Sequence, residues 1–445
     1  TFVTQRKIYF MNFDIIEQRL ARLKKKWPNK KTILFRHRLL IDKKSTYILE
    51  KSLDKRDLIY MRFPTNNKIF IGYDNAIKYI SKNNLTQFSI KRYHIKSNIK
   101  ADKIKIFGGS AFSINSSNNF PWNNIPQIQF TIPKFLFSFD KSKKYFIYSS
   151  FITKHFKVKT ILNEIKNCIN DLNSQSINNK TQIILTSKVL IPNELDYLKK
   201  IDLIKKNILQ KKIKKVVLSR IEQYNISNIE GISTIINNIN NAYPNCFNFL
   251  IKFNNEDYFF GSTPEKIITK KHLSYQTTAI AGSSKNIDLL NDKKEIEEHN
   301  YVIEYLKHVL KKHSNKITIE KTKILDLKYI KHLQTNIKGK TFLNVHILEL
   351  LKKIYPTPAL SGFPNKKALK IINKMENFNR GWYAGALGTY NSEGDGEFYV
   401  PIRSALIRKN KIFLYSGGGI VEKSNAEKEW QETTLKFKHL KNILK

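Results

Sequence analysis

The chain contains 445 residues and carries a formal net charge of +43, from 79 Lys and Arg residues against 36 Asp and Glu residues. Its apolar fraction of 41% is typical of a globular protein and too high for a disordered one. The length allows a large buried core, and since no run of about 18 uninterrupted apolar residues occurs, we expect no membrane span.

The first half of the chain mixes helix and strand patterns. Residues 1–10 lack a secretory signal pattern, and we interpret them as a non-native or disordered leader, with Met11 as a candidate start. Residues 11–200 contain a predicted helix at Phe13–Lys26 and β-rich runs at Thr32–Ile41 and Tyr145–Lys157.

The pattern is clearer in the second half, residues 201–445, and in the helix that leads into it. Helical periodicity is present at Glu194–Leu209 and Glu295–Lys312. The predicted strands are Val216–Ser219, Phe247–Phe253, Tyr258–Phe260, Phe398–Ile407 and Ile412–Ser416. Asn254–Asp257 and Lys409–Asn410 are predicted hairpin turns between them. Because helices and strands do not alternate strictly, we expect an α+β or mixed α/β body with antiparallel sheets.

Two pairs of glutamates are candidate ligands for a divalent cation. Glu295 and Glu298 lie three residues apart and therefore on one helix face, and Glu429 and Glu432 repeat this spacing near the C-terminus. Ser424 is the predicted capping residue of that last helix. Mg²⁺ prefers carboxylate oxygens, usually one or two together with water and substrate oxygens. A solvated face with ordinary Glu–Lys pairs is the alternative for each pair.

Lys215 enters a predicted strand, in which alternation sends Lys215, Val217 and Ser219 to one face. One lysine of the Lys214–Lys215 pair must therefore point toward the interior. A partly desolvated lysine can act as a general base, whereas one that reaches back to water has no such role.

Three further features have weaker signals. Glu265 follows a strand and a proline, and is either a catalytic acid or a strand-end carboxylate. Ser416–Gly419 is predicted to be a glycine loop after a strand, which can direct backbone N–H groups at an anion or can simply be a turn. Arg403 lies in a predicted strand, where it can bind a carboxylate at two points or serve at the surface.

The order of these features resembles one family, the chorismate-utilising enzymes, over about residues 205–445. The resemblance is carried by these segments: Lys215–Arg220, Gly261–Glu265, Ala281–Ser283, Glu297–His299, His332–Thr335, Pro356–Pro364, Arg380–Gly388, Ile402–Ala405, Gly417–Val421 and Glu429–Lys436. Residues 11–200 resemble the family's more variable N-terminal part. The resemblance implies one unit of two large, mainly antiparallel sheets, packed together and surrounded by helices, with the active site between them.

The resemblance also implies roles. Lys215 matches the base that activates water for attack on C2 of chorismate, and Glu265 matches the acid that protonates the departing 4-hydroxyl, with a raised pKa. Glu298 and Glu432 match magnesium ligands, with Glu295 and Glu429 nearby, partly through water. The residues that match the substrate-binding positions are Gly282, Ser283, His332, Ala359, Tyr383, Arg403, Gly417, Gly418 and Lys436.

Within the family, Lys215 and the segment Pro356–Pro364 resemble the isochorismate synthases, which are magnesium-dependent isomerases. Salicylate synthases share the lysine but typically have Thr near Ala359–Leu360. Anthranilate and aminodeoxychorismate synthases use ammonia and usually lack the lysine. Three positions depart from the family pattern. Tyr355 replaces a frequent His, Gly418 replaces a common Ala, and Pro401 lies inside a predicted strand, which should be at an edge or bulged there.

The composition bears on partners and compartment. The positive charge first suggests nucleic acid, and a basic nucleic-acid-binding protein is the non-enzymatic alternative. The lysines are spread along the whole chain, however, and Arg is scarce beside Lys, so we expect a drifted composition and no nucleic-acid partner. Two distant cysteines, Cys168 and Cys246, indicate a reducing compartment, and we expect a cytoplasmic monomer. The sequence does not specify which pathway uses the product, and a quinone pathway such as menaquinone synthesis is preferred.

Overall fold

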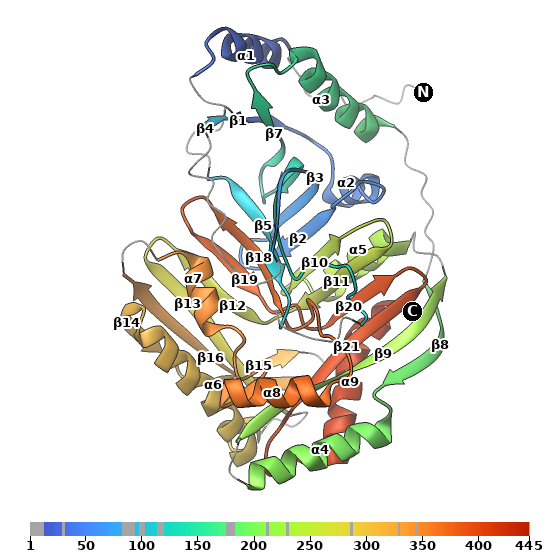
Figure 1. Ribbon diagram of the computed structural model, residues 1–445, viewed down its shortest axis with the longest axis vertical. Coiled ribbons are helices and arrows are strands. Elements are labelled where there is room, and N and C mark those ends of the chain that lie inside the picture. The colour runs from blue at the N-terminus through green and yellow to red at the C-terminus, as the bar shows by residue number, and fades with distance from the viewer. Residues whose placement is uncertain are drawn as a thin grey trace.

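The structure is a computed structural model that describes residues 13–28, 32–81, 94–97, 103–113, 120–174, 183–210, 213–227, 231–284, 288–327, 330–342 and 345–444. The expected leader, residues 1–10, lies outside these ranges. In Figure 1 the first third of the chain forms one end of the long axis, and the second half forms the other end.

Two long strands, β3 (Lys68–Ser81) and β6 (Ile128–Phe139), join the two halves of the sheet structure. They pair antiparallel from Ile69↔Phe139 to Ser81↔Ile128. From β3 the first sheet continues through β2 (Ile59–Phe63), β10 (Phe247–Lys252), β11 (Asp257–Thr263), β20 (Ser404–Arg408), β21 (Lys411–Ile420), β9 (Lys215–Ser227) and β8 (Ile184–Ile191).

The second sheet starts from β6. It continues through β5 (Lys105–Ser110), β18 (Ala386–Asn391), β19 (Gly396–Tyr399), β12 (Lys266–Lys271), β13 (Ser274–Ser284) and β16 (Ile330–Thr341), which also pairs with β14 (Ser314–Ile319) and β15 (Lys323–Leu327). β6 also pairs with β7 (Lys144–Thr153), and β7 with β1 (Thr32–Leu40). The ladder between β1 and β4 (His94–Ser97) is parallel, and the other described ladders are antiparallel. The expected mainly antiparallel fold is confirmed, with its two sheets joined through shared strands.

The sheets pack face to face through aromatic side chains. Phe247 of β10 in the first sheet stacks on Tyr399 of β19 in the second, with ring centroids 4.4 Å apart. Phe249 and Phe107, from different sheets, belong to the same buried cluster. A fully buried aromatic side chain contributes about 1.5–3 kcal/mol to folding. The space between the sheets is therefore mostly a packed apolar core.

A second core lies on the outer face of the first sheet and its extension. It contains Ile16 and Leu20 of α1 (Phe13–Lys25), together with buried residues of other helices. These helices are α2 (Ser45–Lys51), α3 (Val158–Asn173), α5 (Ile232–Ala242) and α9 (Ala426–Leu444). Figure 1 shows α1 and α3 together at the N-terminal end, and α9 beside β21 near the opposite end.

The helix α6 (Lys293–Lys311) forms for reasons visible in its sequence. The Asp292 side chain accepts hydrogen bonds from the N–H groups of Lys294 and Glu295, which caps the first turn. Glu295, Glu298, Val302, Leu306 and Leu310 then form one buried stripe at helical spacing. The predicted range Glu295–Lys312 is confirmed to within two residues, and α4 (Glu194–Leu209) matches its prediction at both ends. The stripe carries the two glutamates inward.

Three local predictions need correction. Ser416–Gly419 is not a loop, because it lies within β21 and pairs with β9. The predicted strand Phe398–Ile407 is two strands, β19 and β20, interrupted around Pro401, which has no N–H to donate to a ladder. The cap of α9 is Asn425, whose side chain accepts from the Lys428 N–H at 2.9 Å, because the Ser424 hydroxyl is used elsewhere.

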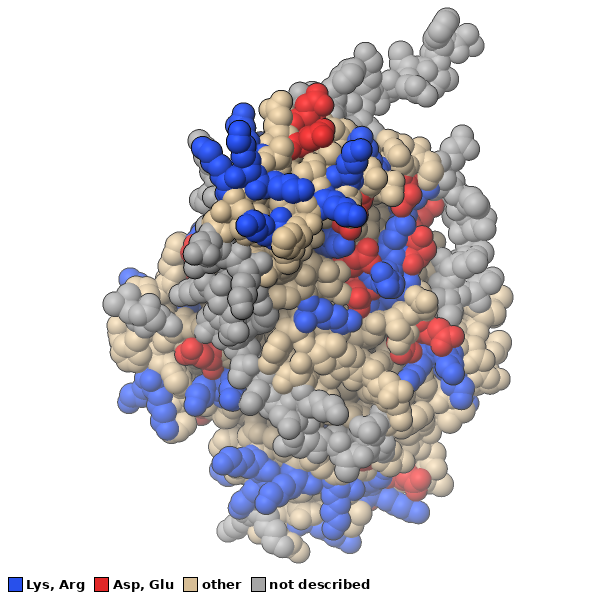
Figure 2. Space-filling view, turned by 45° about the horizontal axis from the view of Figure 1, so that its top comes forward, with Lys and Arg blue, Asp and Glu red and all other residues tan. Residues whose placement is uncertain are grey.

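Among the described helices, none has the length and apolar character that a bilayer crossing needs. Lys and Arg side chains on the face in Figure 2 form several separate groups, with Asp and Glu between them. Helix α7 (Ile347–Ile354) packs against α6 and β12, and helix α8 (Asn365–Met375) packs against β9.

Candidate active site

A polar cavity lies between the two sheets and brings together most of the residues predicted from the sequence. The predicted residues that line it are Glu265, Gly282, Glu295, Glu298, His332, Ala359, Tyr383, Arg403, Gly417, Glu432 and Lys436. The other predicted residues lie next to them. Lys215 contacts Glu298, and Gly418 lies beside Glu429. Ser283 pairs with His332 in the β13–β16 ladder, and its side chain lies outside the described part.

Lys215 and Glu298 form a buried ion pair at one side of the cavity. The Lys215 side chain is fully buried, and its Nζ lies 2.7 Å from Glu298 Oε1. Val217 on the same strand face also lines the cavity, so the alternation expected for β9 is confirmed. Burial alone would raise the pKa of Glu298, but the charges of Lys215, Lys294 and Lys436 together outweigh burial, and the pKa lies below its ordinary value.

The glycines of β21 make room for this pair. A Cβ at Gly419 would lie 2.6 Å from Glu298 Oε1 and 3.0 Å from Lys215 Cε, so a side chain cannot fit there without displacing the pair. The ladder between β20 and β21 ends at Leu414, so on that edge no described strand pairs with β21 at Gly417. The Gly417 carbonyl accepts a hydrogen bond from Lys436 Nζ at 2.9 Å. The backbone of Gly417 therefore remains a candidate contact for substrate.

Each of the other three glutamates also contacts a lysine. Lys294 Nζ lies between two carboxylates, 3.0 Å from Glu295 Oε1 and 3.2 Å from Glu429 Oε1. Lys436 Nζ lies 2.7 Å from Glu432 Oε1. Burial and the neighbouring Glu432 charge raise the pKa of Glu429 to about 7. The lysine ammonium groups thus balance carboxylates that would otherwise repel one another.

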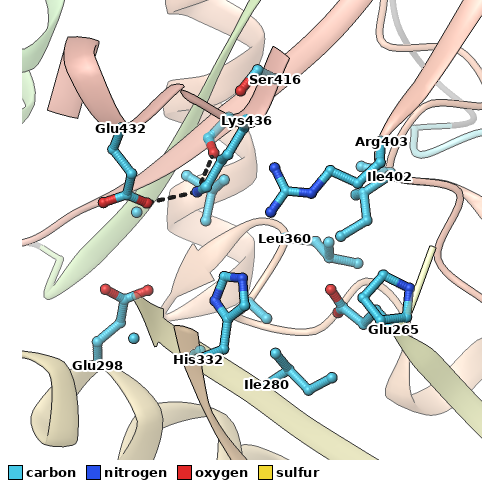
Figure 3. Close-up of a pocket in the computed structure, with 18 of the residues that line it drawn as sticks. Glu265, Ile280, Glu298, His332, Leu360, Ile402, Arg403, Ser416, Glu432 and Lys436 are labelled. Atoms are coloured by element: carbon cyan, nitrogen blue, oxygen red, sulfur yellow. Dashed lines mark hydrogen bonds and ion pairs between the residues drawn. The ribbon is translucent and has the colours of Figure 1, made fainter. Parts of the chain in front are cut away.

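The carboxylates suit a hard divalent cation in chemistry and in direction. Figure 3 shows Glu298 and Glu432 opposite one another on one side of the cavity. In the described part of the chain no group of three or more His, Cys, Asp or Glu side chains is arranged to hold a metal ion. Mg²⁺ often takes only one or two carboxylates and completes its shell with water and substrate oxygens. The residues present therefore fit a two-carboxylate site.

Glu265 lies across the cavity from these two glutamates, with His332 and the Arg403 guanidinium between them (Figure 3). Its side chain is buried, and its backbone N–H donates to Thr263 Oγ1 at 3.2 Å. Burial raises the pKa of Glu265 to about 7, although the charges of Arg403 and Lys215 oppose the rise. The expected raised pKa is confirmed, and such a carboxyl retains a proton near neutral pH.

Glu265 and Arg403 occupy the same bend of the sheet structure. Glu265 lies where the chain passes from β11 in the first sheet to β12 in the second, and Arg403 lies where it returns from β19 to β20. Pro264 and Pro401 occur at the two crossings, and the Val400 N–H donates to the Glu265 carbonyl at 2.9 Å. Because proline has no N–H, both strands break their ladder here. The bend directs both side chains into the cavity.

Cationic and neutral polar groups surround the centre of the cavity. Arg403 has a positive φ of 49°, and within the described residues its guanidinium makes no hydrogen bond or ion pair. His332 donates to the Gly282 backbone, and burial with the nearby charges of Arg403 and Lys436 lowers its pKa well below the ordinary value. The imidazole is therefore neutral. The Tyr383 hydroxyl would lie 3.2 Å from a Cβ at Gly417, so it too reaches the cavity centre.

Sequence reasoning gave no role to several residues that shape the site. Arg380, which lines the cavity, forms a buried ion pair at 2.6 Å with Glu376. Arg220 lies with its Cζ 3.6 Å from the Trp430 ring centroid and donates to Thr433 Oγ1, which holds α9 on β9. Arg220 and Arg380 both occur in the segments that resemble the family, so their position in a motif could have indicated that they belong to the site. Glu376 had none.

The three positions that depart from the family pattern are accommodated. The Tyr355 hydroxyl donates to the Ala384 carbonyl, next to Tyr383. Pro401 lies at the bend, where the ladder is interrupted. A Cβ at Gly418 would lie 3.3 Å from Glu429 Oε2, so the smaller residue leaves more room for this carboxylate.

Comparisons with known proteins identify the family of the chain. Residues 19–445 match the family described as chorismate binding enzyme. The chain is 26% identical over 351 residues to isochorismate synthase MenF of Bacillus subtilis (strain 168), covering 76% of this chain and 74% of that protein. It is 34% identical over 202 residues to isochorismate synthase MenF of Haemophilus influenzae, covering 43% of this chain and 47% of that protein.

A solved structure supports the fold. The menaquinone-specific isochorismate synthase MenF from Escherichia coli superposes with a TM-score of 0.80 at 22% identity, covering 97% of this chain and all of that one. The family match extends over nearly the whole chain, and most of the residues that the family resemblance singles out line the described cavity. The chain therefore belongs to the family of chorismate-binding enzymes.

Proposed function

We propose that this protein is an isochorismate synthase, an isomerase that converts chorismate to isochorismate. The observations that carry the proposal are a buried lysine, Lys215, in contact with Glu298 at one side of the cavity, and a buried carboxyl of raised pKa, Glu265, across the cavity from Glu298 (Figure 3). A lysine at this position distinguishes the members of the family that add water from those that add ammonia. The names of the relatives from Bacillus subtilis and Haemophilus influenzae support the same activity.

In the proposed reaction a water molecule adds to C2 of the ring while the 4-hydroxyl leaves. Lys215 Nζ takes the proton of the attacking water, the ring double bonds shift, and the C4–O bond breaks as Glu265 gives its proton to the departing hydroxyl. One water is consumed and one is released, so the reaction is an isomerisation. General acid and base groups on opposite sides of a ring each contribute about 10²–10⁴-fold to such a rate.

The cationic groups would hold the substrate, which is a dianion. Arg403 can bind one carboxylate at two points, with Tyr383, Lys436 and the backbone of Gly282 and Gly417–Gly418 as further contacts. His332, Ser283 and Ala359 would complete the walls around the ring. Orientation of this kind lowers the barrier because the reacting atoms are already placed.

Mg²⁺ is the proposed cofactor. Glu298 and Glu432 would hold it directly, and Glu295 and Glu429 would support it through water. When bound, the ion would neutralise substrate charge and orient the ring. A cation at Glu298 would compete with the Lys215 ammonium for the same carboxylate, and this competition links metal binding to the candidate base.

The experiment is an assay of the purified protein with chorismate, with and without EDTA, in which isochorismate, salicylate, pyruvate and anthranilate are followed. We expect isochorismate only in the presence of Mg²⁺. Salicylate with pyruvate would identify a salicylate synthase, and anthranilate or aminodeoxychorismate formed with ammonia would identify an aminating enzyme. Retention of DNA without turnover would identify a nucleic-acid-binding protein. A cytoplasmic monomer whose product enters menaquinone synthesis is the setting we propose.

A further inference from the structure

Among the strands that the structure describes, none pairs with one edge of β9, the strand that bears Lys215, over a short stretch beside the cavity. β8 pairs with β9 only as far as Ile221, and β17 (Gly362–Phe363) pairs only with the start of β9, up to Val216. Val217 and Ser219 lie between these two ladders and are buried. Buried backbone N–H and C=O groups need hydrogen-bond partners, so something other than a strand must supply them here.

Two side chains and a loop take the place of the missing strand. Glu376 Oε1 accepts the Ser219 N–H at 2.7 Å, and Arg380 Nη2 donates to the Val217 carbonyl at 2.7 Å. The Ser361 carbonyl accepts the Val217 N–H at 3.0 Å. These contacts hold the Lys215 strand where the described part of the chain provides no neighbouring strand.

Arg380 joins this strand to the adjacent Ala359–Leu360 segment of the cavity wall. Its Nη1 donates to the Leu360 carbonyl at 2.9 Å, and Leu360 and Ala359 line the cavity. The guanidinium also binds Glu376 at two points, with Nε to Oε2 at 2.8 Å and Nη2 to Oε1 at 2.6 Å. Arg380 is 3% exposed and Glu376 9%, so solvent competes little for these bonds.

The two arginines that line the cavity differ in what remains available to a ligand. Arg380 uses Nε, Nη1 and Nη2 in four hydrogen bonds within the protein, and Glu376 neutralises its charge. The Arg403 guanidinium makes no comparable contact with the residues the structure describes, although it points into the cavity (Figure 3). A guanidinium has five N–H donors, so Arg380 is nearly saturated while Arg403 is free for a carboxylate.

We propose that Arg380, together with Glu376, is a positioning residue that holds the Lys215 strand against the Ala359–Leu360 wall and does not itself bind substrate. The inference rests on the proposed function, because the position of Lys215 matters only if it acts on a bound ring. A small displacement of a catalytic group can cost about 10²-fold in rate. Loss of the contacts that Arg380 and Glu376 make with β9 should therefore lower kcat by a larger factor than it raises KM.

The test compares Arg380→Lys with Arg403→Lys in steady-state kinetics with chorismate. We expect Arg380→Lys to lower kcat by about 10- to 100-fold and to change KM by less than about threefold. Arg403→Lys should mainly raise KM. Arg62→Lys is the matched control, since Arg62 Nη1 also donates to a backbone carbonyl, that of Asn240 at 2.8 Å, but lies on β2 outside the cavity lining.

Hydrogen exchange of the β9 peptide gives a readout that does not depend on activity. Exchange should be faster in Arg380→Lys than in the wild type and unchanged in Arg62→Lys. A raised KM with unchanged kcat and exchange would show that Arg380 binds substrate, and wild-type kinetics with lower thermal stability would show a merely structural role. Either result overturns the proposal.

A second variant covers the case in which Arg380→Lys does not fold, and hydrogen exchange covers the case in which the wild type is inactive. If Arg380→Lys does not fold, Glu376→Gln keeps the guanidinium and weakens the acceptor of the Ser219 N–H, and an unchanged kcat in that variant also overturns the proposal. If the wild-type protein does not convert chorismate, the proposed function fails, while the exchange of β9 still decides whether these contacts hold the strand.

Discussion

The Nζ of Lys215 lies 2.7 Å from Oε1 of Glu298, so the candidate base is held by a candidate metal ligand. The two residues come from different elements, β9 and α6, and the pair is buried beside a glycine that cannot accept a side chain. A buried ion pair that loses one member leaves an uncompensated charge, which is costly. The pair therefore has consequences for stability as well as for chemistry.

Replacement of Lys215 should affect both. We expect Lys215→Ala to reduce isochorismate formation by about 10²–10⁴-fold and to lower the free energy of unfolding by about 3–5 kcal/mol, because Glu298 is left buried and unpaired. Activity assays and denaturant unfolding would measure the two effects. Lys214→Ala is the control, since Lys214 is the adjacent lysine but is exposed. Undiminished product formation by Lys215→Ala would exclude the base assignment.

The pKa of Glu265 predicts the alkaline limb of the rate profile. Since burial raises this pKa to about 7, the proton donor is lost as the pH rises through 7, and kcat/KM should fall about tenfold per pH unit above it. Glu265→Gln should abolish turnover. A pH–rate profile without an alkaline limb near 7 would contradict the role of Glu265.

The same shift predicts a change in stability. The folded protein binds this proton more tightly than the unfolded chain, whose carboxyl has a pKa of 4.5. The contribution of the protonated carboxyl is therefore complete below about 4.5 and is lost as the pH rises through about 7. Thermal unfolding between these values should show a decline that is weaker in Glu265→Gln.

Magnesium should bind and stabilise the folded protein. We expect EDTA to abolish turnover and added Mg²⁺ to raise Tm, because a ligand that binds only the folded state stabilises it. Glu298→Gln and Glu432→Gln should each weaken Mg²⁺ binding in calorimetry by at least about tenfold. Glu304→Gln changes an exposed residue of the same helix and serves as the control. Full turnover in EDTA would contradict the metal requirement.

The net charge should affect capture of the substrate. A surface potential set by a charge of +43 attracts a dianion, and salt screens this attraction within about 8–10 Å near physiological ionic strength. We expect kcat/KM to fall as NaCl is raised from low to physiological concentration while kcat changes little. Salt-independent kcat/KM would contradict electrostatic steering.

Much of the local structure followed from periodicity. Helical periodicity predicted the helix α6 and the shared face of Glu295 and Glu298, and strand alternation predicted that one of two adjacent lysines points toward the interior. The turns Asn254–Asp257 and Lys409–Asn410 join paired strands as predicted. These features depend on neighbours in sequence, and the sequence therefore contains enough information to predict them.

Other features depend on contacts between distant segments. The glycines at 417–419 were interpreted as a loop because glycine favours turns, whereas Gly419 is required inside a strand by the closeness of Glu298 and Lys215. The partnership of Glu376 with Ser219 compensates for a strand that is absent from one edge of β9. Neither the close approach nor the unfilled edge is visible before the sheet is assembled.

The bend that carries Glu265 and Arg403 has an implication for how the enzyme tolerates motion. Both residues lie at the bend where the chain crosses between the sheets twice, and the hydrogen bond from the Val400 N–H to the Glu265 carbonyl joins the two crossings. If the two sheets move relative to one another, the candidate proton donor Glu265 and the Arg403 guanidinium move together. A substrate bound to Arg403 would keep its leaving group aligned with Glu265. Only the distance from the ring to the water on the Lys215 side would vary.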